Sequence, residues 1–125
     1  MDTSSATPAL ADVLDRARQF VDEELVPVEP LLLQGDFDML ATSMDAARQR
    51  ARDLGLWNPH LPADEGGLGL GLDGFGRVSE VLGRSPLGHY ACNCQAPDAG
   101  NMELMLAHAT DAQRCLLYTS DAADE

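Results

Sequence analysis

The sequence has little positive charge. Eight lysine and arginine residues stand against 21 aspartate and glutamate residues, which gives a formal net charge of −13 at pH 7. Negative charge in this excess disfavours binding to nucleic acid and to anionic membrane surfaces. The simplest interpretation is an acidic surface in contact with solvent.

Long apolar runs and signal segments are also missing. No run approaches the roughly 20 apolar residues that a membrane span requires. Met1 is followed by small and acidic residues, and not by a basic and then an apolar stretch. Three cysteines do not make a disulfide framework. A reducing cytoplasm is therefore the expected location.

Strand alternation is absent too, and apolar residues recur at helical spacing instead. The first such run predicts a helix over Ala9–Leu25 that ends at Pro27 and Pro30, because proline cannot donate and clashes with the preceding turn. Val28–Asp36 is expected to be a connector. At least one leucine of its triplet 31–33 should pack under the bundle, since three exposed leucines would be unfavourable.

Later segments predict further helices. The second starts near Phe37 and stops at Gly55. The third spans Leu72–Leu82, and its inward face is expected to hold Leu72, Phe75, Val78 and Leu82. A short helix within residues 87–95, one capped by Asp98 and one beginning at Asp111 complete an all-α fold, a bundle of about five to six helices. The start at Asp111 rests on the capping-box spacing of Thr110 and Gln113.

The stretch 54–70, LGLWNPHLPADEGGLGL, has neither the helical nor the strand periodicity of apolar residues. Glycine and proline exclude a regular element, yet leucine and tryptophan are interleaved with them. Such a loop is expected to be structured and partly buried, with glycine where the backbone needs positive φ or close approach. It offers no catalytic group.

The remaining reactive residues favour structural roles. Cys92 and Cys94 are two thiols where a zinc site usually needs four ligands, so they are predicted to be small buried side chains. Ser79 and Glu80 are neighbours on a helix and face different directions. Residues 66–69, GGLG, lack the lysine and the preceding strand of a phosphate loop. No catalytic, metal-binding or cofactor-binding residue is therefore predicted.

The stretch 94–102, CQAPDAGNM, is the best functional candidate. Its small residues leave room for a groove, and the amides of Gln95 and Asn101 could form hydrogen bonds. A tight helix–helix junction built on alanine and glycine explains the same residues. The residues by themselves leave both interpretations open.

The order of these motifs resembles the N-terminal domain of the acyl-CoA dehydrogenases. The matching pieces are the LGLW of residues 54–57, the Leu61–Leu70 loop and the SEVLG of residues 79–83. They run in order from about Ala17 to Arg114. Residues 93–103, NCQAPDAGNME, resemble one subfamily, some of whose members also carry a phosphotransferase-like domain.

The resemblance implies a function for the parent protein. In this family a glutamate removes the α-proton of an acyl-CoA thioester, FAD accepts the β-hydride, and an electron-transferring flavoprotein reoxidises the flavin. The helix that corresponds to residues 94–102 lines the acyl-chain pocket, so the resemblance places Gln95, Ala96 and Ala99 in the pocket wall. The flavin contacts and the glutamate come mostly from two further domains, and the family is usually dimeric or tetrameric. The present chain alone is therefore expected to lack FAD and activity.

The last eleven residues, CLLYTSDAADE, lose the helical pattern. One choice of codons for them resembles a transposase mosaic-end sequencing adapter read in frame. We therefore expect a domain over residues 1–114 and a non-native tail over 115–125. The alternative is a self-standing acidic helical interaction module without catalysis, which requires these residues to be native.

Overall fold

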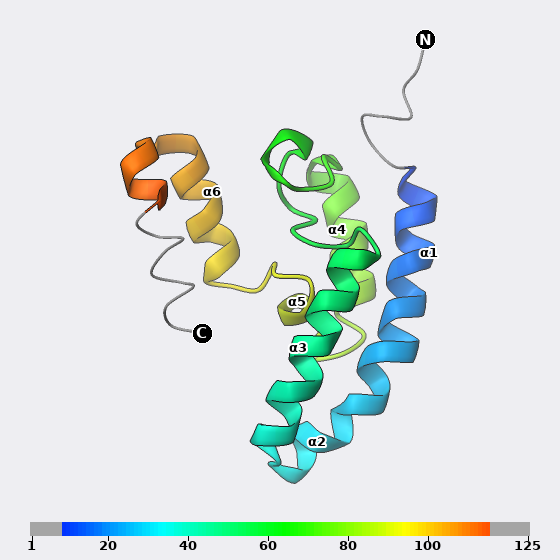
Figure 1. Ribbon diagram of the computed structural model, residues 1–125. Coiled ribbons are helices and arrows are strands. Elements are labelled where there is room, and N and C mark those ends of the chain that lie inside the picture. Colours follow the sequence, from blue (N-terminus) through cyan, green and yellow to red (C-terminus); the bar gives the residue numbers. More distant parts are fainter. Residues whose placement is uncertain (1–8, 116–125) are drawn as a thin grey trace. The chain divides into compact units, whose positions relative to one another are not determined.

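The computed structural model describes residues 9–115. All regular secondary structure in this range is helical, and none of these residues forms a strand, which confirms the all-α prediction (Figure 1). The chain divides into two compact units, Met1–Gln95 and Ala96–Glu125.

The first predicted helix is confirmed, and its final turns change type. α1 (Leu10–Phe20) continues as the π-helical segment η1 (Val21–Leu25) and the 3-10 turn η2 (Val26–Val28). The side chains of Val13, Ala17 and Phe20 are buried, and the π segment keeps Leu25 buried as well. The predicted apolar face is therefore continuous across the change of helix type.

The predicted connector is wrong, because part of it is the short helix α2 (Glu29–Gln34). Pro30 lies in the first turn of α2, where proline is tolerated because a backbone N–H there has no partner within the helix. The leucine triplet behaves as expected. Leu32 packs against the core, whereas Leu33 is 85% exposed.

α3 (Phe37–Asp53) begins and ends where the sequence places it. The Asp36 side chain accepts a hydrogen bond from the Met39 amide at 3.3 Å, which caps the first turn. At the other end the amides of Gly55 and Leu56 donate to the carbonyls of Arg52 and Ala51. This is a Schellman ending, and Gly55 supplies its left-handed residue with φ of 73°.

The loop that follows α3 is structured and partly buried, as predicted. Leu56, Pro59 and Leu61 are buried, and the 3-10 turn η3 (Ala63–Glu65) lies inside the loop. A Cβ added at Gly67 would collide with the backbone carbonyl of Leu61. Gly67 therefore serves internal packing, while Gly66 supplies a left-handed residue with φ of 83°. The backbone of Leu61 fills the space that a phosphate cradle would leave open.

α4 (Gly71–Leu82) also matches its predicted range, but one inward residue is wrong. Leu72 is 88% exposed, whereas Val78 and Leu82 are buried and Phe75 is partly buried against the core. The buried stripe also includes Gly74, and Leu72 lies about 120° around the helix from Val78. The first turn of α4 therefore presents Leu72 to solvent.

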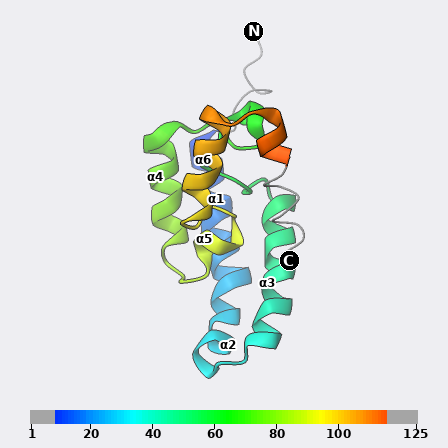
Figure 2. The same cartoon turned by 90° about the vertical axis from the view of Figure 1, so that its left-hand side faces the viewer.

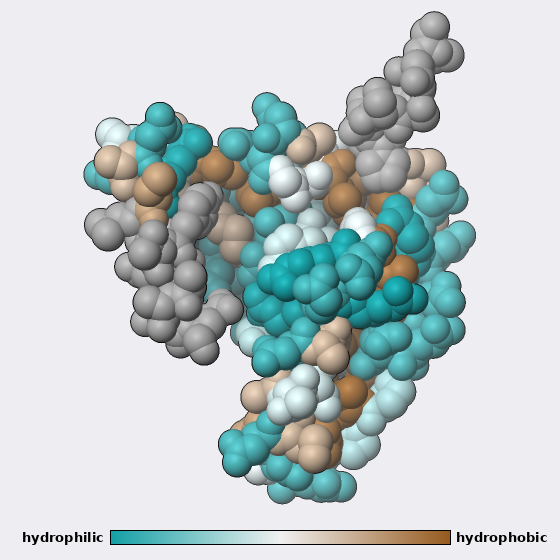
Figure 3. Space-filling model, in the orientation of Figure 1, coloured by the Kyte–Doolittle hydropathy of each residue, from teal (hydrophilic) through white to brown (hydrophobic). Residues whose placement is uncertain are grey.

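α5 (Gly88–Ala91) is a single turn that lies in the first unit. In that unit one apolar cluster joins α1, η1, α3, the loop, α4 and α5. Figures 1 and 2 show α1, α3 and α4 running side by side. Figure 3 shows hydrophilic residues over much of one face of this unit. None of the helices within residues 9–115 has the length and hydropathy of a membrane span.

The second unit contains α6 (Asp98–His108) and a further helical turn over residues 111–115. The capping box is confirmed, since the Thr110 and Gln113 amides each bond the other's side chain, at 3.0 and 3.2 Å. Asp98 is not the cap that the sequence predicted. Pro97 takes that position, and Asp98 lies in the first turn, near the positive end of the helix dipole.

Candidate functional site

The three predicted pocket-wall residues fall on both sides of the division between the units. Gln95 is exposed and is the last residue of the first unit. Ala96 and Ala99 belong to the second unit, where Ala99 lies half-buried in the first turn of α6. The two alanines therefore lie in one unit and Gln95 in the other.

Arg48 of α3 contacts two aromatic rings and two hydrogen-bond acceptors in the first unit. Its guanidinium carbon lies 4.9 Å from the centroid of the Trp57 ring and 4.3 Å from that of Tyr90. The same group donates to the Tyr90 carbonyl at 3.1 Å and to Asn93 Oδ1 at 3.3 Å. Arg52 covers Trp57 as well, at 3.9 Å from the ring centroid. Cation–π contacts and hydrogen bonds therefore connect α3 to the structured loop and to α5.

Two asparagines extend this group of contacts. Asn58 and Asn93 have φ of 52° and 61°, in the left-handed region that asparagine tolerates better than most residues. Asn93 Nδ2 donates to Asn58 Oδ1 at 2.8 Å, and the Asn58 amide donates to the Cys92 carbonyl at 3.0 Å. The loop and the end of α5 are thus bonded through both side chains and backbone.

Asn93 also ends α5. Its amide donates to the Tyr90 carbonyl at 3.2 Å, and the Cys94 amide donates to the His89 carbonyl at 3.0 Å. This is the Schellman pattern, with asparagine in place of the usual glycine. The roles of Asn58 and Asn93 were not predicted from the sequence, although asparagine in segments rich in helix breakers is a signal for left-handed backbone.

Ser79 has a partner that sequence reasoning did not find. Its Oγ lies 2.8 Å from Nε2 of His89, whereas Glu80 is exposed. A serine beside an imidazole is the start of a nucleophile–base arrangement, which usually also needs a group that orients the base. Among residues 9–115 no carboxylate hydrogen-bonds to the His89 ring. The pair therefore connects α4 to α5 as a structural contact.

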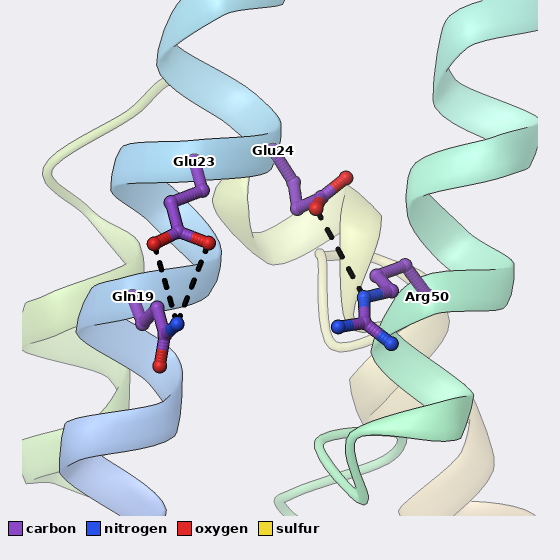
Figure 4. Close-up of polar contacts among 4 residues, drawn as sticks. All are labelled: Gln19, Glu23, Glu24 and Arg50. Carbon is purple, nitrogen blue, oxygen red and sulfur yellow. Dashed lines mark hydrogen bonds and ion pairs between the residues drawn. The ribbon is translucent and has the colours of Figure 1, made fainter.

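A shallow cleft lies between α1–η1 and α3. Figure 4 shows Glu24 facing Arg50 of α3, at 3.9 Å between Oε2 and Nε, and Gln19 beside Glu23 on α1–η1. Gln19 Nε2 donates to both carboxylate oxygens of Glu23, at 3.4 and 3.2 Å. The Arg16 guanidinium, which also lines the cleft, donates to the Leu54 carbonyl. The polar side chains of this cleft are thus engaged with one another or with the backbone.

Cys92 and Cys94 are both free and buried, as predicted. Burial disfavours the charged thiolate, so it raises the pKa of Cys94 to about 12. The pKa of Cys92 rises further, mainly through burial and also through the neighbouring Cys94. Within residues 9–115 no three metal-ligating side chains gather in one place.

The raised pKa values predict a loss of stability at high pH. An unfolded thiol ionises near its ordinary pKa of 9.0, while these folded thiols stay protonated. The unfolded state therefore binds fewer protons above pH 9, and the free energy of unfolding falls from there towards pH 12. Urea unfolding between pH 8 and 10.5 measures this, and Cys92→Ala/Cys94→Ala should flatten the decline. An unchanged slope in that variant would contradict the assignment.

The fold defines an all-helical domain. Its first unit carries a structured glycine- and proline-rich loop, and its second unit contains a further helix. The family model for the acyl-CoA dehydrogenase N-terminal domain matches residues 7–117. The chain belongs to the acyl-CoA dehydrogenase family, as its N-terminal helical domain.

Several relatives agree with this assignment. The mouse acyl-CoA dehydrogenase family member 10 is 32% identical over 117 residues, which cover 86% of this chain and 11% of that protein. The human family member 11 is 27% identical over 111 residues, which cover 82% of this chain and 14% of that protein. A solved structure from Mycobacterium abscessus, assigned as an acyl-CoA dehydrogenase, superposes with a TM-score of 0.75 at 32% identity. That match covers 87% of this chain and 30% of the solved chain, so the chain spans less than a third of these relatives.

Proposed function

We propose that this chain is the N-terminal part of a flavin-dependent enzyme that dehydrogenates acyl-CoA thioesters between the α and β carbons. The observation that carries the proposal is the match of residues 7–117 to the family's N-terminal domain. The solved relative adds support, because its fold agrees with this all-helical chain at 32% identity. The proposed electron acceptor is electron-transferring flavoprotein. The whole enzyme is proposed to be a homo-oligomer in the cytoplasm.

FAD would supply the acceptor for the hydride in that enzyme. The loop at residues 66–69 offers no cradle for its phosphates, since the Leu61 backbone already occupies the place next to Gly67. The role proposed for this chain is to shape one wall of the acyl-chain pocket. Gln95 would contribute a polar amide there, and the small side chains of Ala96 and Ala99 would leave room for the acyl chain.

Because no flavin cradle and no catalytic glutamate are proposed for it, the chain alone is expected to purify without flavin and to turn over no acyl-CoA. Absorbance between 350 and 500 nm, recorded after purification in the presence of about 10 µM FAD, measures bound flavin. Reduction of an artificial electron acceptor by acyl-CoA measures turnover. A stoichiometric flavin spectrum would overturn the expectation, and heat-treated protein is the control.

The boundary at Arg114 is also a proposal. The family model reaches residue 117, three positions into the segment 115–125 that resembles an adapter, and residues 116–125 lie outside the described range. Sequencing the source locus past the codon for Arg114 tests both points. A reading frame that continues into a β-rich domain and a second helical domain supports the enzyme. Native coding sequence for residues 115–125 removes the adapter proposal, and a frame that ends there favours an interaction module.

A further inference from the structure

The first unit ends in a segment whose backbone is held by three hydrogen bonds, one from the loop and two from α5. Within residues 92–94, the Cys92 carbonyl accepts from Asn58, the Asn93 amide donates to Tyr90, and the Cys94 amide donates to His89. Gln95, the first proposed pocket-wall residue, follows directly. Whatever fixes residues 92–94 therefore fixes the chain direction at Gln95.

One side chain contacts several parts of this arrangement. The half-buried Arg48 guanidinium lies against the Trp57 and Tyr90 rings and donates to Tyr90 and Asn93. Asn93 in turn donates to Asn58, which holds the Cys92 carbonyl. Arg48 thus reaches the segment through a direct bond and through the asparagine pair.

The contacts require arginine and not merely a positive charge. A planar guanidinium can stack on two aromatic rings while it donates to two oxygens in different directions, and a lysine ammonium cannot do both. Residues 9–115 provide no carboxylate within ion-pair distance of Arg48, so its charge is balanced by ring faces, a carbonyl and an amide oxygen.

We infer that Arg48 is a positioning residue for the acyl-pocket wall: through Tyr90, Asn93 and Asn58 it sets the course of the chain into Gln95. This rests on the proposed function of Gln95. Arg48 touches neither substrate nor reacting atoms in this proposal, and it acts through the backbone of residues 92–94.

Hydrogen exchange on the 125-residue chain tests the positioning directly. Arg48→Lys and Arg48→Met are expected to speed exchange of the Asn58, Asn93 and Cys94 amides about tenfold, because hydrogen bonds to a charged donor and a stacked contact are lost. Amides in the middle of α1 and α4 should change less than about twofold. The emission of Trp57, the single tryptophan, should shift in the same two variants.

Arg50→Lys is the matched control, since Arg50 lies on the same helix and, within residues 9–115, its side chain makes only a 3.9 Å ion pair with Glu24. It should leave the three amides unchanged. Unaltered exchange in the Arg48 variants would overturn the inference. A uniform increase that includes α1 and α4 would also overturn it, because it would report only a loss of global stability.

The complete enzyme from the source locus tests the consequence for the pocket. Arg48→Lys is expected to raise KM for acyl-CoA several-fold while kcat stays within about twofold, since substrate placement is disturbed and the reacting groups are not. An unchanged KM overturns the role in the pocket wall. A complete enzyme that oxidises no acyl-CoA overturns the proposed function instead, and the exchange experiment then still decides whether Arg48 positions residues 92–94.

Discussion

Gly88→Ala is expected to destabilise the first unit by about 3 kcal/mol, at the upper end of the range for overpacking. A Cβ at this position would collide with the backbone carbonyl group of Leu82 at the end of α4. Main-chain atoms cannot move aside as a flexible side chain can, so the α4–α5 connection would have to shift. The buried residues on both sides, Leu82 and Ala91, would lose packing with it. Urea denaturation measures the change.

Gly76→Ala is the matched control for this change. Gly76 lies in α4, and a Cβ there would meet no atom within 4 Å. Alanine favours a helix over glycine by about 1 kcal/mol, so this variant should gain stability of that order. Equal losses in the two variants would show that the contact with Leu82 is not the cause.

Leu82→Ala is expected to lower the free energy of unfolding by about 3 to 4 kcal/mol. The Leu82 side chain is 0% exposed and belongs to the apolar cluster that joins the helices of the first unit. Truncation removes buried methyl groups and leaves a cavity that close-packed neighbours fill only in part. Thermal and urea unfolding of the variant measure the loss.

Leu72→Ala provides the comparison within the same helix. Leu72 is 88% exposed, so its truncation should change stability by less than about 0.5 kcal/mol. The pair also tests the corrected orientation of α4. If Leu72→Ala were as costly as Leu82→Ala, the first turn of α4 would face the core, as the sequence alone had suggested.

The sequence predicts helices well where apolar residues repeat over several turns. The ranges of α3 and α4 agree with their periodicity, and the capping box correctly places the start of the turn after Thr110. The sequence-based prediction fails at α2, since Pro27 and Pro30 were interpreted as breakers although Pro30 lies in the first turn of a helix. It also fails at Leu72, because a stripe on a short helix does not define its centre without knowing what packs against it.

Within the candidate site, sequence and structure decide different things. The family follows from the order of motifs along the chain. The proposal that Ala96 and Ala99 line a pocket follows from that resemblance and from their small side chains. No spacing rule links Arg48 to Trp57, Tyr90 and Asn93, which lie up to 45 positions away. The same holds for Ser79 and His89, whose contact depends on how α4 turns into α5.

The sequence by itself determined the helical class, the structured loop and the family, because local periodicity, breakers and motif order are properties of the chain. Only the tertiary structure decided which face of each helix is buried, which glycines lie against backbone, and which arginine holds the segment before Gln95. Those features depend on contacts between residues that are distant in sequence, and packing of the whole unit brings them together.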